Sequence, residues 1–194
     1  MAASPPGTSQ AGTSQVGTAP AGTVPARPAH RPPPRWWRTT EPRPARRTVV
    51  SAAVTTSVGL AVVVAVGALL HQTVLVPPLA ATTAIVTATP GSPLAQPRHV
   101  FGGHLLSCLV CFVVLALGWH GPWAAAAACG IACGLVLVLK AAHPPAMATA
   151  VMIMLTDPPA HSFVPLLAAG LALLVGVQML SSRLQREVYP TTWW

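Results

Sequence analysis

Acidic side chains are nearly absent from this sequence, which contains only Glu41, Asp157 and Glu187 among 194 residues. Most hydrolytic mechanisms need paired carboxylates, a nucleophile with its base or a phosphate-binding loop, and nothing along the chain resembles these arrangements. We therefore expect neither an enzyme nor a bound cofactor. Charged residues of both signs make up only 7% of the chain, against about 25% in an ordinary soluble domain. This composition excludes a typical soluble protein.

Long uncharged apolar runs are what the sequence has instead, with a mean hydropathy of +0.60. From Thr48 onward four runs have about the length that crosses a bilayer core. They cover residues 48–70, 102–119, 122–139 and 163–180. Two shorter runs, 74–89 and 141–156, are each interrupted by a Pro-Pro pair. We therefore predict an all-α, multi-pass protein of the cytoplasmic membrane, with four long transmembrane helices and two short membrane-embedded helices.

The N-terminal residues 1–47 differ from the rest and predict a disordered, basic tail rich in Pro, Ala and Thr. Seven of the eleven basic residues lie between Arg27 and Arg47, which places the N-terminus in the cytoplasm by the positive-inside rule. Arginines beside Trp36 and Trp37 also occur in nucleic-acid-binding arms, but a lipid anchor is the simpler interpretation, so we expect no nucleic-acid partner. The predicted organisation is tail, membrane bundle (48–182) and short C-terminal tail (183–194).

The two short runs resemble each other. Moving the first by 67 positions places five of its residues on identical residues of the second. The pairs are Pro77 with Pro144, Pro78 with Pro145, Ala81 with Ala148, Thr82 with Thr149, and Thr89 with Thr156. The surrounding order of long, short and long runs also occurs twice. A two-fold internal repeat is therefore predicted, and short, interrupted segments in corresponding positions are typical of transporter binding sites.

The short runs either cross the membrane or dip in and return. Six crossings would place Arg98, Lys140, Arg183 and Arg186 with the basic tail and Asp157 on the other side. Four crossings would put Arg98 and Lys140 outside. The positive-inside rule favours six crossings with inverted halves. Length argues for the other topology, because a helix that begins at Pro145 has only about 12 apolar residues, against the ~20 needed to span.

Each Pro-Pro pair predicts a helix start inside the membrane, because proline fits the first turn of a helix. The following N–H groups would be free, and the positive end of the helix dipole would point at the same place, so a small anion fits both. Candidate contacts are Pro77, Pro78 and Thr82 in one half and Pro144, Pro145 and Thr149 in the other. His143 would act as donor, proton carrier or gate. Alternatively, the prolines only mark where a loop enters a helix, and His143 and Lys140 lie at the interface between membrane and water.

At these residues the sequence resembles the HPP family of integral membrane proteins, named for the tripeptide at His143–Pro145. The segment "SPLAQPRHVFGGHLLS", Ser92 to Ser107, is similar to a second family signature, and "SSRLQREVYP" to the C-terminal edge. The resemblance covers residues 48–190. It implies a small bundle, usually of four membrane helices, and some plastid and cyanobacterial members are nitrite transporters. The family usually has Gly-Gly after the tripeptide, where this chain has Ala146 and Met147, which would narrow the site.

Within the second signature, Arg98 would draw anions toward the protein or contact lipid headgroups. His104 and Ser107 lie one turn apart inside an apolar run, where a histidine is either functional or a hydrogen-bonded packing residue. Cysteines occur in two pairs, 108 with 111 and 129 with 133. A four-thiolate metal site is conceivable, but burial beside a Gly-x-x-x-Gly packing face at Gly130 and Gly134 is simpler, and we predict no metal site.

The sequence thus favours a transporter or channel for a small inorganic anion, with nitrite as the first candidate, bound at the N-termini of the two short helices. Its expected partners are that anion, the lipid bilayer and further copies of the chain in a homo-oligomer. The alternative is a membrane scaffold or regulator that transports nothing and acts through the basic tail.

Overall fold

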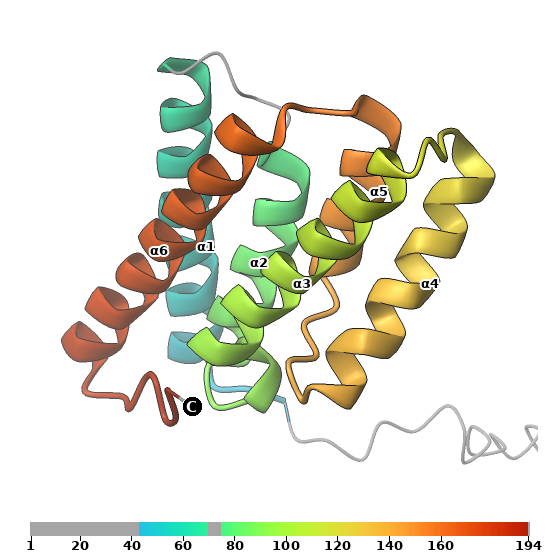
Figure 1. Ribbon diagram of the computed structural model, residues 1–194. Helices are drawn as coiled ribbons and strands as arrows, with labels where there is room; N and C mark the ends of the chain where they lie inside the picture. Colours follow the sequence, from blue (N-terminus) through green and yellow to red (C-terminus); the bar gives the residue numbers. More distant parts are fainter. Residues whose placement is uncertain (1–42, 70–74, 194) are drawn as a thin grey trace, which may run out of the picture. The chain divides into compact units, whose positions relative to one another are not determined.

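The computed structural model describes residues 43–69 and 75–193, and its ordered elements in this part of the chain are helical (Figure 1). The helices are α1 (Arg46–Leu69), α2 (Val76–Ala88), α3 (Pro97–Ala116), α4 (Pro122–Val138), α5 (Ala146–Thr156) and α6 (Ala160–Gln185), with a 3-10 turn η3 (Pro93–Ala95) before α3. The all-α prediction is confirmed for these ranges. Residues 1–42 of the predicted tail lie outside them.

Three helices are long and apolar enough to cross a membrane, namely α1, α3 and α6 with 24, 20 and 26 residues. The prediction of four long helices is not confirmed, because α4 has only 17 residues, or about 25 Å of helix. Its ends explain the length: Gly121 with φ +93° and Pro122 set its start, and Lys140 adopts a left-handed φ of +53° just after its end. The short runs form the short helices α2 and α5, of 13 and 11 residues.

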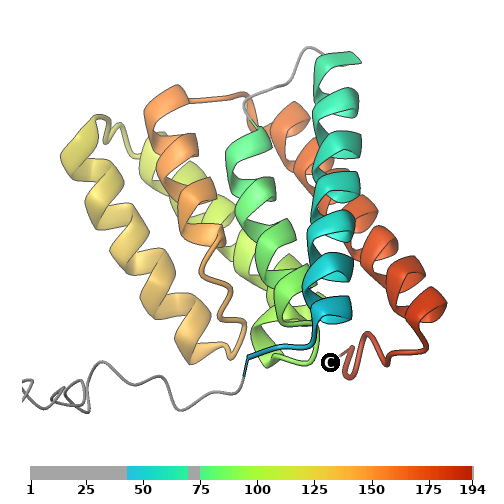
Figure 2. The same cartoon turned by 180° about the vertical axis from the view of Figure 1, so that it is seen from behind.

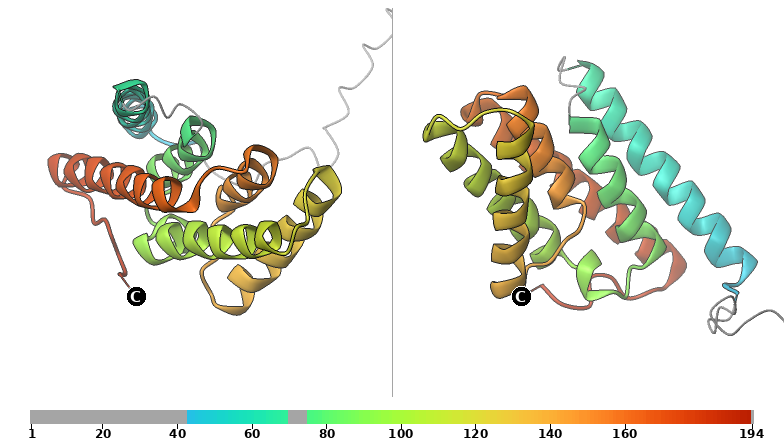
Figure 3. Two further views of the ribbon diagram at one scale, coloured as in Figure 1. Left: turned by 45° about the horizontal axis from the view of Figure 1, so that its top comes forward. Right: turned by 90° about the vertical axis from the view of Figure 1, so that its right-hand side faces the viewer.

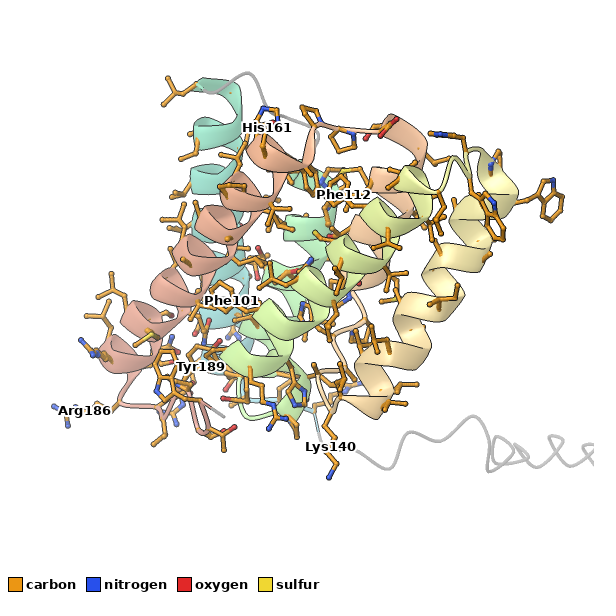
Figure 4. The ribbon with its side chains drawn as sticks, viewed as in Figure 1. Phe101, Phe112, Lys140, His161, Arg186 and Tyr189 are labelled. Atoms are coloured by element: carbon orange, nitrogen blue, oxygen red, sulfur yellow. The ribbon has the colours of Figure 1, made fainter. Side chains whose placement is uncertain are left out.

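Successive helices run in opposite directions (Figures 1 and 2). The chain therefore brings the start of α1, the start of α3, the end of α4 and the end of α6 to one end of the bundle. These termini carry Arg46, Arg98, Lys140 and Arg183, so we call this the basic end. Figure 4 shows Lys140 and Arg186 at this end and His161 at the opposite one. This is the charge separation on which the prediction of six crossings depends.

The outer surface of the bundle is apolar, and several polar side chains are buried within its largely apolar core. Large aliphatic and aromatic side chains face outward along α1, α4 and α6, including Trp123 at 88% exposure and Val138 at 77%. Threonine, histidine and glutamine side chains are buried instead, among them Thr83, His104 and Gln178. Such a surface is unfavourable in water and suits lipid, where interior polar groups must satisfy one another.

The short helices lie within the bundle. α2 contacts α1, α6 and α5, whereas α5 contacts α3, α4 and α2, so the two short helices meet each other (Figure 3). Neighbouring helices therefore cover Pro78 and Pro145, which are buried, whereas Pro77 and Pro144 remain exposed.

The prediction that Gly130 and Gly134 form a helix-packing face is wrong for contacts within the chain. A Cβ added to either glycine would meet no atom within 4 Å, and both residues are exposed. α4 instead buries a stripe of small side chains at Ala125, Ala128 and Ala132. Since alanine and glycine both allow close approach, composition alone identified the wrong face of the helix.

The four cysteines do not form a thiolate site. Cys108 and Cys111 are buried, Cys129 is half-buried and Cys133 is exposed. Among the residues that the structure describes, no three His, Cys, Asp or Glu side chains are grouped closely enough to hold a metal ion.

The alternating helix directions predict which positions share a side of the membrane. Single cysteines at Lys140 and Arg186, in a background without the four native cysteines, should react with an impermeant thiol reagent from the same side. A cysteine at His161 should react from the opposite side, because α6 separates it from Arg186. Labelling of inside-out and right-side-out vesicles measures this. Reaction of positions 140 and 161 from one side would show that α5 re-enters instead of crossing.

Candidate functional site

The segment before α5 turns back into the bundle instead of passing along its surface. α4 ends with Ala141 N–H bonded to the Val136 carbonyl at 2.8 Å, and two residues later His143 is only 1% exposed. α3 makes room for this segment with a glycine. A Cβ at Gly103 would lie 2.7 Å from the Cβ of His143 and 3.1 Å from the Ala141 carbonyl oxygen. The two signature segments of the sequence are therefore packed directly on each other.

Four buried side chains meet at this contact, and we call them the His–Thr cluster: Thr82, His104, His143 and Thr149. Thr82 Oγ1 lies 2.9 Å from His104 Nε2 and 3.2 Å from His143 Nε2. His104 Nδ1 lies 2.7 Å from Thr149 Oγ1. The two imidazole ring centres are 5.2 Å apart, and each of the four residues is at most 1% exposed.

Thr82 and Thr149 are the threonines that the predicted repeat places in equivalent positions. Each lies four residues after the second proline of its pair, on α2 and α5 respectively. Together they bind the two nitrogens of one imidazole, that of His104 on α3.

The partners of His143 determine where its proton lies. His143 Nδ1 is 2.8 Å from the Leu94 carbonyl oxygen, which only accepts hydrogen bonds. Nδ1 therefore carries the proton of the neutral ring, and Nε2 presents a lone pair. The single O–H of Thr82 lies within reach of both the Pro78 carbonyl and His143 Nε2. When it donates to His143, the hydrogen bonds follow one continuous direction. Thr149 O–H donates to His104 Nδ1, His104 Nε2–H donates to Thr82 Oγ1, Thr82 O–H donates to His143 Nε2, and His143 Nδ1–H donates to Leu94.

The N–H groups that follow the second Pro-Pro pair are not free, contrary to the sequence-based expectation. Those of Ala146, Met147 and Ala148 donate to the carbonyls three residues earlier, at 2.9, 3.1 and 3.0 Å. A tight turn of the 3-10 type over His143–Pro145 thus satisfies the donors before the α-helical pattern begins.

The first Pro-Pro pair also leaves fewer free donors than expected, because α2 begins at Val76, before its prolines. Residues up to Pro78 form the first turn, where N–H groups lack intrahelical acceptors, and Pro77 and Pro78 have no N–H to offer. The N–H of Leu79 is already within the helical hydrogen-bonding pattern.

The other predicted site residues divide by burial. Pro78 and Pro145 are buried, Pro77 and Pro144 are exposed, and Arg98 is half-buried at the basic end, outside the cluster. The Pro78 carbonyl is the one proline group that touches the cluster, 3.0 Å from Thr82 Oγ1.

Ser107 is fully buried, and its hydroxyl has no hydrogen-bond partner. It lies four residues after Gly103 and four before Cys111 on α3, and both of those residues contact the α5 segment. Cys111 Sγ donates to the Ala150 carbonyl at 3.4 Å, and Gly103 approaches Ala146. Positions four apart share one face of a helix, so Ser107 also faces α5 with an uncommitted hydroxyl.

Residues of the connector before α3 were not singled out as site residues by the sequence, although they hold the cluster. Gln96 Nε2 donates to the carbonyls of Pro90 and Ser92 at 2.8 and 3.0 Å, and its Oε1 accepts from Thr191 N–H at 2.9 Å. Tyr189 O–H donates to the Ala95 carbonyl at 2.9 Å, and burial raises the pKa of this hydroxyl, which keeps it a donor. The C-terminal segment thereby fixes the turn that presents Leu94 to His143.

A second group of buried and half-buried polar side chains joins α1 to α2 and α6. Thr55 Oγ1 lies 2.7 Å from Ser181 Oγ, and Thr56 Oγ1 lies 2.6 Å from Thr87 Oγ1. A cavity of about 30 Å³ borders Thr55, Thr87 and Gln178, and Gln178 Oε1 has no hydrogen-bond partner. This volume suffices for one water molecule to satisfy that oxygen.

Comparison with known proteins gives one family match. The sequence pattern of the HPP transmembrane region matches residues 41–190. A transmembrane protein of Dictyostelium discoideum is 31% identical over 130 residues, which are 62% of this chain and 46% of that protein. A second transmembrane protein of the same organism is 28% identical over 124 residues, 59% of this chain and 40% of that protein. The chain spans less than half the length of these curated relatives. No solved structure matches it.

The contact at Gly103 predicts a selective loss of stability. Gly103→Ala should lower the free energy of unfolding by roughly 1–3 kcal/mol, because the new methyl group would overlap His143 Cβ and the Ala141 carbonyl. Gly134→Ala is the matched control, since a Cβ there meets nothing within 4 Å. Thermal unfolding in detergent measures both. Equal stability of the two variants would mean that α3 and the His143 segment do not approach this closely.

Proposed function

The chain belongs to the HPP transmembrane family, and we propose that it is a membrane transporter for a small inorganic anion, with nitrite as the first candidate. The observation that carries the proposal is the His–Thr cluster. Ionisable side chains buried in a membrane protein are costly, and those that persist usually line a solute or proton pathway. Here two imidazoles are held at full burial by both short helices and α3.

Charge at the basic end supports an anion over a cation. The described residues carry seven Lys or Arg side chains and two acidic ones, Asp157 and Glu187. Every one of the seven lies at or near the basic end, because the helices alternate in direction. Such an excess of positive charge raises the local concentration of anions. Arg98, at the start of α3, stands beside the connector that leads to His143.

The site in this proposal differs from the one that the sequence suggested. Its donors are side chains: the hydroxyls of Thr82, Thr149 and Ser107 and the imidazole N–H groups. Main-chain N–H groups at the two helix starts contribute little, because they are paired or replaced by proline. The anion would bind where Ser107 and the cluster face α5, beside the first turn of that short helix.

Burial of the cluster favours a transporter over an open channel. Each of its four side chains is fully or almost fully covered, so a solute would reach them only when helices move apart. The two halves, α1–α3 and α4–α6, run in opposite directions with a short helix in the middle of each (Figure 1). This order supports an inverted repeat, whose halves rock against each other during alternating access.

We further propose the cytoplasmic membrane as the location, with six crossings and the N-terminus inside. The basic end would then face the cytoplasm, as the positive-inside rule requires. A scaffold that acts through the basic tail is the alternative function, and a homo-oligomer is compatible with either.

Flux through the purified protein in liposomes tests the site. We expect Thr149→Val to weaken the apparent affinity for nitrite roughly 2- to 10-fold, the net effect of losing one hydrogen bond. Thr82→Val should do more, since both imidazoles lose their hydroxyl partner. Thr83→Val is the matched control: Thr83 is equally buried on α2, but its hydroxyl bonds only the Leu79 carbonyl of its own helix.

Nitrate, formate and chloride, offered beside nitrite, define the substrate. If none of these anions crosses through the parent protein, the transport proposal fails. If all do, but the three threonine variants behave alike, the cluster is only a structural element.

Deletion of residues 1–34 separates the two candidate functions. A transporter should keep its flux per inserted molecule within about twofold, because termini outside a packed core usually tolerate removal. Flux is measured with the same liposomes. A chain that keeps full flux but loses its cellular effect would indicate that the tail carries a scaffold function.

A further inference from the structure

The Thr82 hydroxyl has one proton and two acceptors within reach. The Pro78 carbonyl oxygen lies 3.0 Å from Thr82 Oγ1, and His143 Nε2 lies 3.2 Å from it. When His143 is neutral, its Nε2 lone pair has only the Thr82 hydroxyl as donor, because Nδ1–H is already directed at Leu94. The Thr82 O–H then donates to His143 Nε2, and the Pro78 carbonyl receives no hydrogen bond from Thr82.

A second arrangement of protons satisfies the same atoms. If His143 binds a proton at Nε2, that N–H donates to Thr82 Oγ1, and the Thr82 proton turns to the Pro78 carbonyl. Thr82 Oγ1 then accepts two N–H bonds, from His104 and His143, and donates one, which uses its full capacity. No heavy atom has to move between the two arrangements. The hydroxyl of Thr82 therefore acts as a switch that accommodates either charge state of His143.

We propose that His143 binds a proton that travels with the anion, so that the protein is a proton–anion symporter with one proton per monovalent anion. This inference rests on the proposed transport function and names its coupling ion. The proton comes from water on the loading side, occupies the Nε2 lone pair, and returns to water on the other side. No covalent bond forms in the solute, and nothing is oxidised or reduced.

Among the residues that the structure describes, none around His143 provides a counter-ion for its protonated form. α2 contributes Thr82 and Pro78, and α5 contributes Thr149, none of which titrates. α3 contributes two histidines, His99 and His104, with Arg98 at its start, and α4 ends at Lys140, so the nearby ionisable groups are basic. Within the described residues the acidic side chains are Asp157, just after α5, and Glu187, after α6, and both are exposed. No hydrogen bond joins either of them to the cluster.

A buried cation without a counter-ion is costly, and so is a buried anion. Each therefore stabilises the other, and thermodynamic linkage requires the effect to be reciprocal: protonation of His143 raises anion affinity, and the anion raises proton affinity. The pair crosses the membrane without net charge. The transmembrane potential then does not oppose uptake of an anion into a negative interior, whereas it would oppose a uniporter.

Simultaneous measurement of anion and proton movement in liposomes tests the inference. Vesicles containing the full chain and a trapped pH-sensitive dye receive an inward gradient of nitrite or nitrate, with protein-free vesicles as blanks. Nitrate is included because its acid is fully ionised near neutral pH, so it cannot carry protons across lipid by itself. We expect protein-dependent acidification together with anion uptake, and uptake that rises by up to about 10-fold per unit of lower external pH where proton loading limits the rate.

Two variants probe the switch. His143→Gln keeps a polar, buried side chain that does not bind the proton, and it should lose proton uptake at least 10-fold relative to anion uptake. Thr82→Val should also separate the two fluxes, since the protonated ring would lose its acceptor. Thr83→Val should leave the ratio of proton to anion unchanged.

Nitrogen NMR of the His143 ring, recorded on the protein in detergent, measures the protonation state and tautomer of this residue independently of transport. Neutral His143 should carry its proton on Nδ1, and added nitrite should increase the doubly protonated fraction. Anion flux without proton movement, or a proton on Nε2 of the neutral ring, would overturn the inference and leave the transport function standing. Absence of any anion flux would overturn the transport function, and the inference with it.

Discussion

The hydroxyl of Thr82 is the contact on which the interior of this protein depends. Burying imidazoles among apolar helices is favourable only if every ring nitrogen has a partner, because lipid offers none. Thr82 satisfies one nitrogen on each of two rings at once. Since these rings belong to α3 and to the segment before α5, one hydroxyl on α2 joins three parts of the bundle. The burial of His104 and His143, the approach at Gly103 and the meeting of the short helices all depend on this arrangement.

The side chains of the His–Thr cluster could be identified from the sequence, because they are polar residues within otherwise apolar runs. His143 interrupts an apolar run, His104 lies inside another, and Thr82 and Thr149 hold equal places after two proline pairs. A polar residue inside an apolar run can be recognised from the order of residues along the chain. The directions of the helices could be predicted only in part. The distribution of positive charge favours the alternating directions that the structure has, whereas the short length of the run after Pro145 favours a re-entrant segment.

Main-chain geometry could not be predicted in the same way. The Leu94 carbonyl determines the tautomer of His143, yet every residue has a carbonyl, so no letter of the sequence marks it. Similarly, proline predicts that a helix begins nearby but not whether the first turn is α-helical or of the tighter type that pairs the N–H groups of residues 146–148. Helix packing at Gly130 and Gly134 could not be predicted either, because small residues permit close packing without requiring it.

The bonds of the C-terminal segment have a consequence for how the protein can be handled and altered. Tyr189 and Thr191 form hydrogen bonds to the turn that positions Leu94. The C-terminal segment is therefore linked to the centre of the bundle. Removing them, or attaching a rigid tag immediately after them, would loosen a carbonyl about a hundred residues away in sequence and so disturb a histidine that neither change touches. Purification handles are better placed before α1, where no such bond is at risk among the residues described.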